Sequence, residues 1–157
     1  MIKAILSDFS RVVLFTQDAH EGASHKALYE KISQKPDYNV FDYFTVNTAL
    51  LDFYKSLHLP AYIFTSGLVQ EDPQFQPHLK PIFSKIFSGK IMGLKKDNPE
   101  SYKRILRQIN IKPEEAIYTD DKIENIEAAK QAGLHAFRYA NNEDLFAKIK
   151  EIVLATK

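Results

Sequence analysis

Three aspartates of this chain follow short apolar segments. Asp8 comes directly after Ala4–Ser7, and Asp120 and Asp121 come directly after Ile117–Thr119. If these segments are buried parallel strands, the carboxylates meet at one edge of a sheet, where they repel one another and are poorly solvated. Such a cluster is stable mainly when a hard cation is held between the carboxylate oxygens. The spacing therefore predicts a magnesium-centred site for phosphate chemistry.

Two further polar segments lie between these aspartates in the chain. Thr65-Ser66-Gly67 follows an apolar run, and Lys95-Lys96 comes before the late acidic pair. A carboxylate can attack phosphorus, a hydroxyl and backbone N–H groups can hold phosphoryl oxygens, and a lysine offsets their charge. Each segment taken alone has an ordinary structural explanation as a turn, a helix cap or a solvated surface pair. Only the ordered set indicates a phosphoryl pocket.

Brief apolar runs alternate along the chain with longer amphipathic stretches. The runs predict strands, because each is rich in apolar, β-branched or aromatic residues and is bounded by polar or turn residues; they are Ile2–Ser7, Ala61–Thr65, Ala116–Thr119 and His135–Arg138. The stretches predict helices, with boundaries supported by proline, asparagine and glycine, at Tyr43–Leu57, Pro99–Ile109, Ile123–Ala132 and Asn142–Leu154. The alternation predicts an α/β fold, a Rossmann-like parallel sheet with helices on both faces.

Length and composition exclude several classes of protein. A chain of 157 residues, 45% of them hydrophobic, predicts a single domain over residues 1–157. Lys plus Arg (21) nearly balances Asp plus Glu (20), so we expect no dedicated nucleic-acid binding. The absence of cysteine excludes disulfides, thiolate zinc sites and a cysteine nucleophile. No apolar segment reaches the length of a signal peptide core or a membrane span, which favours a cytoplasmic protein without membrane partners.

The ordered set resembles the haloacid dehalogenase-like (HAD) hydrolase superfamily over most of the chain. Ala4–Ser10 is similar to its first motif, with Asp8 in the nucleophile position. Ala61–Gly67 is similar to the second, with Thr65 as the phosphate-binding hydroxyl.

The other two motifs of the superfamily also have counterparts. Gly93–Tyr102 resembles the third, where alignment on Pro99-Glu100 places Lys96 in the lysine position and leaves Lys95 spare. Tyr118–Gly133 is the most specific match, because the acidic pair, a following asparagine and an Ala-Ala-Lys-x-Ala-Gly helix all fall at the family's spacing.

The resemblance implies a set of roles. Magnesium would be coordinated by the Asp8 carboxylate, the Ser10 backbone carbonyl and Asp121, with Asp120 and Asn125 as neighbours of the ion. It also implies an aspartyl-phosphate intermediate on Asp8, with the phosphoryl oxygens held by Thr65, Ser66, Gly67 and Lys96. A receiver domain of a signalling relay uses the same residue types, but its acidic pair comes early in the chain, whereas here it comes last.

Two departures from the family pattern affect the expected chemistry. Family phosphatases carry a second aspartate two residues after the nucleophile as general acid and base; this chain has Ser10 there, followed by Arg11 where glycine is usual. The second departure is the cap, because only residues 16–42 remain for it, enough for one or two helices. Ser24–Gln34 is expected as one helix, and the aromatic residues Phe41, Tyr43 and Phe44 either anchor a second element or pack in the core.

We therefore expect a magnesium-dependent hydrolase of the HAD type, acting as a phosphatase on a phosphate ester. A small cap would leave the pocket open either to a phosphorylated small molecule or to a macromolecular substrate. The alternative is a non-catalytic protein that binds a phosphorylated ligand or a protein partner through the same pocket. Ser10 and Arg11 are the residues that favour this alternative.

Overall fold

The computed structural model describes residues 1–156. Its strands are β1 (Ala4–Ser7), β2 (Leu14–Thr16), β3 (Phe44–Val46), β4 (Ala61–Thr65), β5 (Phe83–Ser88), β6 (Ala116–Asp120) and β7 (His135–Arg138). Its α-helices are α1 (His25–Ile32), α2 (Thr48–Ser56), α3 (Gln76–Leu79), α4 (Gly89–Met92), α5 (Pro99–Gln108), α6 (Ile123–Gln131) and α7 (Asn142–Ala155). None of the helices within residues 1–156 is long and apolar enough to cross a membrane.

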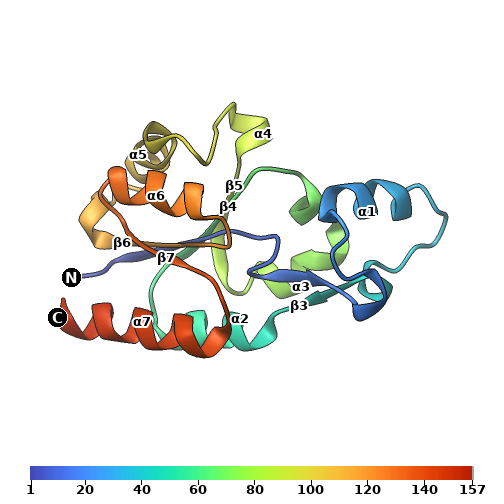
Figure 1. Cartoon of the computed structure of the whole chain (residues 1–157), viewed down its shortest axis with the longest axis horizontal. Helices are drawn as coiled ribbons and strands as arrows, with labels where there is room; N and C mark the ends of the chain where they lie inside the picture. Colours follow the sequence, from blue (N-terminus) through green and yellow to red (C-terminus); the bar gives the residue numbers. More distant parts are fainter. Residues whose placement is uncertain (157) are drawn as a thin grey trace.

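Five strands form one parallel sheet in the order β5-β4-β1-β6-β7, with β1 at its centre. Helices α2 and α7 lie on one face of the sheet, and α5 and α6 lie on the other (Figure 1). The predicted α/β fold with helices on both faces is confirmed. Because the strands run parallel, the carboxyl ends of β1, β4 and β6 lie at the same edge of the sheet.

Both faces of the sheet are buried, which explains why its strands are continuous apolar runs. On one face, Ile5 and its neighbour Ile117 belong to the cluster that includes Leu50 of α2 and Ile149 of α7. On the other face, Leu6 and its neighbours pack with α5 and α6 in a second cluster that includes Phe64, Tyr102, Tyr118 and Ile126. Successive residues of one strand therefore point to opposite faces of the sheet and pack against different helices.

Two segments differ from the sequence prediction. The predicted helix Tyr43–Leu57 begins only at Thr48, because Phe44–Val46 pairs antiparallel with Leu14–Thr16. Asn47 then caps α2, its side-chain oxygen accepting a hydrogen bond from the Leu50 amide. The edge strand β5 was not predicted, since Phe83–Ser88 places exposed Ser84 and Lys85 within its apolar residues.

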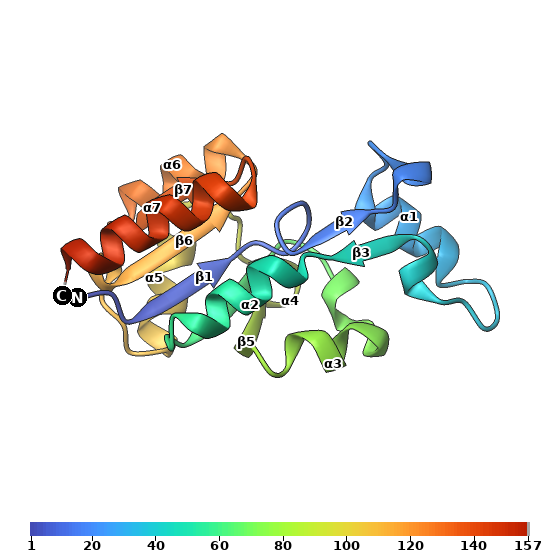
Figure 2. The same cartoon turned by 90° about the horizontal axis from the view of Figure 1, so that it is seen from below.

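Residues 14–46 form a small lid over one end of the sheet. It consists of the β2–β3 hairpin, α1 and a short 3-10 helix at Val40–Asp42, and it projects beyond the parallel sheet (Figure 2). Phe44 and Ile32 of the lid are buried in the same cluster as Ile5 and Phe9. The single domain expected from length remains a prediction, and this shared core favours it.

The lid is also held by polar contacts to the loop after β4. The Tyr29 hydroxyl of α1 donates to a carboxylate oxygen of Asp72 at 2.9 Å, and the Tyr38 hydroxyl donates to the same oxygen. Asp72 is buried and its other oxygen accepts from the Gln74 amide at 2.8 Å. These bonds fix α1 relative to the sheet.

Candidate active site

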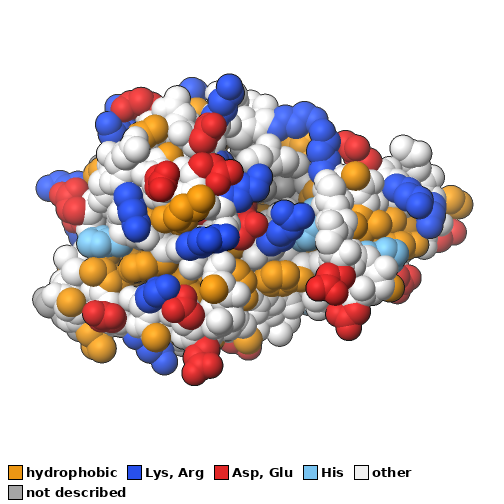
Figure 3. All heavy atoms as spheres, in the orientation of Figure 1, with side chains coloured by type: hydrophobic (Ala, Val, Ile, Leu, Met, Phe, Trp, Pro, Cys, Tyr) orange, Lys and Arg blue, Asp and Glu red, His pale blue; other side chains and the backbone are white. Residues whose placement is uncertain are grey.

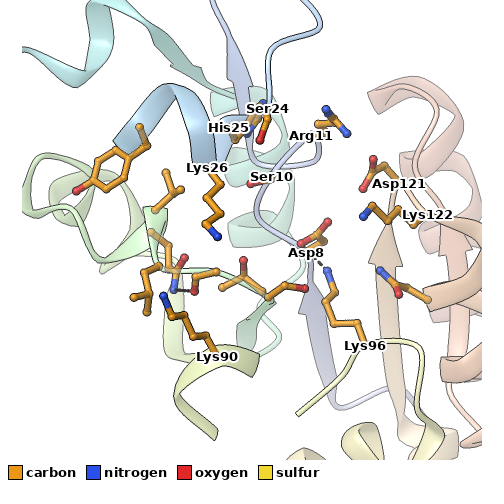
Figure 4. Close-up of a pocket in the computed structure, with 18 of the residues that line it drawn as sticks. Asp8, Ser10, Arg11, Ser24, His25, Lys26, Lys90, Lys96, Asp121 and Lys122 are labelled. Carbon is orange, nitrogen blue, oxygen red and sulfur yellow. Dashed lines mark hydrogen bonds and ion pairs between the residues drawn. The ribbon is translucent and has the colours of Figure 1, made fainter. Parts of the chain in front are cut away.

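The polar residues predicted to act together do converge at the carboxyl edge of the sheet (Figure 4). A cavity of about 590 Å³ opens between this edge and the lid. Every predicted site residue except one lines it: Asp8, Ser10, Thr65, Ser66, Gly67, Lys96, Asp121 and Asn125. The exception is Asp120, which is fully buried beneath the cavity wall.

Asp8 lies at the end of β1, and the two oxygens of its carboxylate have different surroundings. Its Oδ1 accepts the Phe9 amide at 2.7 Å and lies 2.6 Å from the Lys96 ammonium. Among the hydrogen bonds of residues 1–156, none reaches its Oδ2. Burial raises the pKa of Asp8 to about 7, an effect that Asp120 reinforces and Lys96 opposes.

Asp120 differs from Asp8 in having both oxygens occupied by protein donors. Oδ1 accepts the Lys122 amide at 2.9 Å. Oδ2 lies 2.6 Å from the Lys96 ammonium, accepts Asn125 Nδ2 at 3.1 Å and accepts the Tyr118 hydroxyl. Burial alone would raise the pKa of Asp120, but Lys96 and the other donors outweigh it and lower that pKa. Asp120 is therefore suited to position Lys96 and Asn125.

The structure places Lys96, and not Lys95, in the cavity. Lys96 is 6% exposed and bridges Asp8 and Asp120, whereas Lys95 is exposed. Burial opposes the charge on Lys96, but the two carboxylates outweigh burial and raise its pKa. The Tyr102 hydroxyl donates to the Lys96 carbonyl at 2.6 Å, which fixes the backbone there.

A glycine sets the path of the chain toward Lys96. A Cβ on Gly89 would lie 2.5 Å from the Leu94 carbonyl oxygen, and the Leu94 amide donates back to the Gly89 carbonyl at 2.9 Å. Any side chain at this position would push the segment before Lys96 away.

The three aspartates fit a divalent cation. Asp8, Asp120 and Asp121 each offer an oxygen, and these oxygens all lie within 4.8 Å of one another. Burial and the Asp120 charge raise the pKa of Asp121, whose carboxylate lies beside those of Asp8 and Asp120. Carboxylate oxygens are the ligands that Mg²⁺ prefers. Since Asp120 is saturated by protein donors, Asp8 and Asp121 are the carboxylates available to a cation.

The loop after β4 has the features of a phosphoryl-binding turn. The Gly67 carbonyl accepts both Ser88 Oγ and Gln70 Nε2 at 2.8 Å, and the Ser66 carbonyl accepts the Lys90 amide at 3.1 Å. The amides of Ser66 and Gly67 donate none of the loop hydrogen bonds within residues 1–156. They remain available for an anion, beside the buried side chain of Thr65.

Sequence reasoning missed several residues that also line the cavity. They come from the lid, from α4 and from the start of α6, and include His25, Lys26, Tyr29, Lys90 and Lys122. Their spacing along the chain carries no motif, so only the fold brings them together. Arg11, which was noted as a departure, also lines the cavity and adopts φ 63°, a left-handed conformation that glycine adopts more easily.

Comparison with known proteins places these features in a family. A family model described as haloacid dehalogenase-like hydrolase matches residues 10–138. The chain belongs to this family. The match to the HAD model begins two residues after Asp8, so the assignment of Asp8 rests on its geometry and on the sequence motif.

Curated proteins also match part of the chain. The chain is 34% identical over 96 residues to an enolase-phosphatase E1 from Persephonella marina, a match that covers 58% of this chain and 41% of that protein. The chain therefore spans less than half of the length of this curated relative.

Solved structures share the HAD fold of this chain at low sequence identity. A HAD-like family hydrolase from Porphyromonas gingivalis superposes with a TM-score of 0.71 at 18% identity, over 98% of each chain. A HAD family enzyme from Bacteroides thetaiotaomicron, in complex with magnesium and inorganic phosphate, gives 0.64 at 15% identity, over 90% of this chain and 96% of that one.

Proposed function

We propose that this HAD hydrolase is a magnesium-dependent phosphatase that cleaves phosphate monoesters through an aspartyl phosphate on Asp8. The observation that carries the proposal is the asymmetry of Asp8. One of its oxygens is held by the Phe9 amide and Lys96, while the other accepts no hydrogen bond within the described residues. A carboxylate held in this way is oriented for attack.

The reaction would proceed in two displacements. A carboxylate oxygen of Asp8 attacks phosphorus, the bond from phosphorus to the ester oxygen breaks, and that oxygen takes up a proton from water and leaves as an alcohol. A water molecule then attacks the phosphorus of the aspartyl phosphate and gives up a proton, the bond to Asp8 breaks, and inorganic phosphate leaves. Lys96, Thr65 and the amides of Ser66 and Gly67 would hold the phosphoryl oxygens. Magnesium held by Asp8, Asp121 and the Ser10 carbonyl would supply charge neutralisation at these oxygens.

Of the groups proposed to act in the reaction, the proton donor to the leaving group is the weakest. Ser10 stands in the cavity at the position of the usual acid, and a hydroxyl is a poor proton donor near neutral pH. Esters with good leaving groups need little protonation and should react best. The cavity of about 590 Å³ suits a small molecule more than a macromolecular substrate.

The relatives support hydrolysis of a phosphate ester. The curated relative is named a phosphatase, and one structural neighbour was solved with magnesium and inorganic phosphate. These names favour a hydrolase over the non-catalytic alternative.

The test is phosphate release from a panel of alkyl and aryl phosphates, with and without Mg²⁺. Wild type should release phosphate only with the metal, Asp8→Asn should release none, and the control Lys95→Ala should match wild type. Release by Asp8→Asn at the wild-type rate would refute the nucleophile. Binding of a phosphorylated ligand without release on the whole panel would establish the binding protein instead.

A further inference from the structure

Cationic side chains surround the cavity beyond the phosphoryl site. Lys26 of the lid and Lys90 of α4 lie on one side of Asp8, and Arg11 and Lys122 lie on the side of Asp121 (Figure 4). Lys and Arg side chains lie on both sides of the hollow between the lid and the rest of the molecule (Figure 3). The lining residues beyond the metal and phosphoryl groups include one acid, Glu30, against these four cations.

Lys26 lies in the first turn of α1, and two hydrogen bonds hold this helix in position. The Ser24 side chain caps the helix and the Tyr29 hydroxyl ties it to Asp72. Glu30 is the nearest counter-charge to Lys26, at 3.9 Å, and the two side chains are 73% and 61% exposed. A pair so long and so exposed is weak, so Lys26 remains available to a ligand.

Lys90 approaches from the opposite wall and is fixed by its backbone. Its amide donates to the Ser66 carbonyl at 3.1 Å, which attaches it to the loop proposed to hold the phosphoryl group. Its ammonium makes no ion pair with any residue from 1 to 156. Figure 4 shows the Lys90 and Lys26 side chains extending into the same part of the cavity, one from α4 and one from α1.

Two ammonium groups directed into one space repel each other unless an anion lies between them. We propose that Lys26 and Lys90 form a second anion subsite, and that the substrate is a compact phosphate monoester carrying a second anionic group, a carboxylate or another phosphate. This inference rests on the proposed function, because the phosphoryl group must first be held at Asp8. The lid contributes to specificity through Lys26, and the core contributes through Lys90.

A matched pair of substrates tests the subsite. 3-Phosphoglycerate and glycerol 3-phosphate have the same three-carbon length, but one ends in a carboxylate and the other in a neutral hydroxymethyl group. Wild type should show kcat/KM about tenfold higher for 3-phosphoglycerate, the effect of one good charge-assisted contact. Propane-1,3-diol bisphosphate and its monophosphate give the same comparison with a phosphate as the second anion. The substrate pair with the larger ratio of kcat/KM values shows which second anion is preferred.

The variants are Lys26→Met and Lys90→Met, which keep most of the side-chain volume and remove the charge. Each should lose most of the preference for the dianionic substrate through a higher KM, while kcat/KM for glycerol 3-phosphate stays within about twofold. Lys31→Met on the same helix and Lys95→Met near α5 remove equal charge from exposed positions that do not line the cavity, and both should keep the wild-type ratio.

Binding to the Asp8→Asn variant separates failure of the subsite from failure of the proposed reaction. Calorimetry should give a lower Kd for 3-phosphoglycerate than for glycerol 3-phosphate, with the difference lost when Lys26→Met or Lys90→Met is added. If the preference in binding is present but wild type hydrolyses neither these two compounds nor any alkyl or aryl phosphate of the panel, the subsite stands and the phosphatase proposal falls. If wild type hydrolyses both at equal kcat/KM, or if the Lys31→Met control has the same effect as Lys26→Met, the subsite is refuted and the phosphatase stands. Equal Kd values without hydrolysis of any phosphate of the panel refute both.

Discussion

The Lys96 ammonium lies 2.6 Å from Oδ1 of Asp8, and both side chains are almost fully buried. This ion pair holds the proposed nucleophile in place and offsets its charge in a poorly solvated site. Breaking a buried pair by removing one partner is costly, because the remaining charge loses its compensation.

Lys96→Met should therefore reduce both stability and activity. We expect a loss of about 3 kcal/mol in the free energy of unfolding, and a fall in kcat of about 10²–10³. Urea denaturation and steady-state kinetics measure the two effects. Lys95→Met is the matched control, and an equal effect of both substitutions would show that the wrong lysine was assigned.

Magnesium should stabilise the folded state, because it relieves repulsion among the aspartates. At ten times its Kd, bound Mg²⁺ adds about 1.4 kcal/mol, which raises Tm by roughly 3–6 °C for a chain of this size. Thermal melts with increasing MgCl₂ would show the shift, and Asp121→Asn should abolish it. Glu124→Gln, which removes an exposed acid nearby, should keep it; a wild-type melt that ignores millimolar Mg²⁺ would rule out the metal site.

Ser10→Asp should raise turnover on alkyl phosphates, since a carboxyl group can protonate the leaving alcohol and then activate water. The gain should be about 10-fold or more and should be small for aryl phosphates, whose leaving groups need little protonation. Because Arg11 lies next to the new carboxylate, the double variant with Arg11→Gly is measured in parallel. No gain on alkyl substrates in either protein would show that proton transfer does not limit this enzyme.

His25 contributes stability that is lost as the solution becomes acidic, in the direction opposite to Asp8, whose raised pKa favours the folded state as pH falls. Burial, together with the nearby Arg11 charge, lowers the pKa of His25 to about 4 in the folded state, against about 6.5 in an unfolded chain. Between these values the unfolded chain binds a proton that the folded protein does not. The stability that depends on neutral His25 is thus complete above about pH 6.5 and is lost as pH falls toward 4.

His25→Gln should remove this contribution, so the unfolding free energy should decrease less, or increase more, as pH falls from 6.5 to 4. Urea denaturation at several pH values measures the slope, which is independent of any constant loss of packing against Phe44. His58→Asn is the control, because His58 is exposed and its φ of 54° is one that asparagine tolerates. An unchanged slope in His25→Gln would assign the acid sensitivity to other groups.

The sequence alone determined the sheet core and the order of its polar strand ends. Ala61–Thr65 and His135–Arg138 have the predicted bounds, because buried parallel strands are short apolar runs that local sequence reveals. Pro99 and the Asn98 cap likewise mark the start of α5 by local chemistry. Since parallel strand ends share one edge, the meeting of Asp8 with Asp121 followed from the order of elements.

Only the tertiary structure decided the form of the lid and the contacts that set the site residues apart. Leu14–Thr16 pairs with Phe44–Val46 across about thirty residues, a contact that no local pattern encodes, so a strand replaced the start of a predicted helix. The family resemblance already implies different roles for the two late aspartates, and the fold supplies the physical reason, because it surrounds Asp120 with four donors and leaves Asp121 open. Lys26 and Lys90 line one cavity for the same reason, because α1 and α4 are far apart in the chain and only the fold places both beside the carboxyl edge of the sheet.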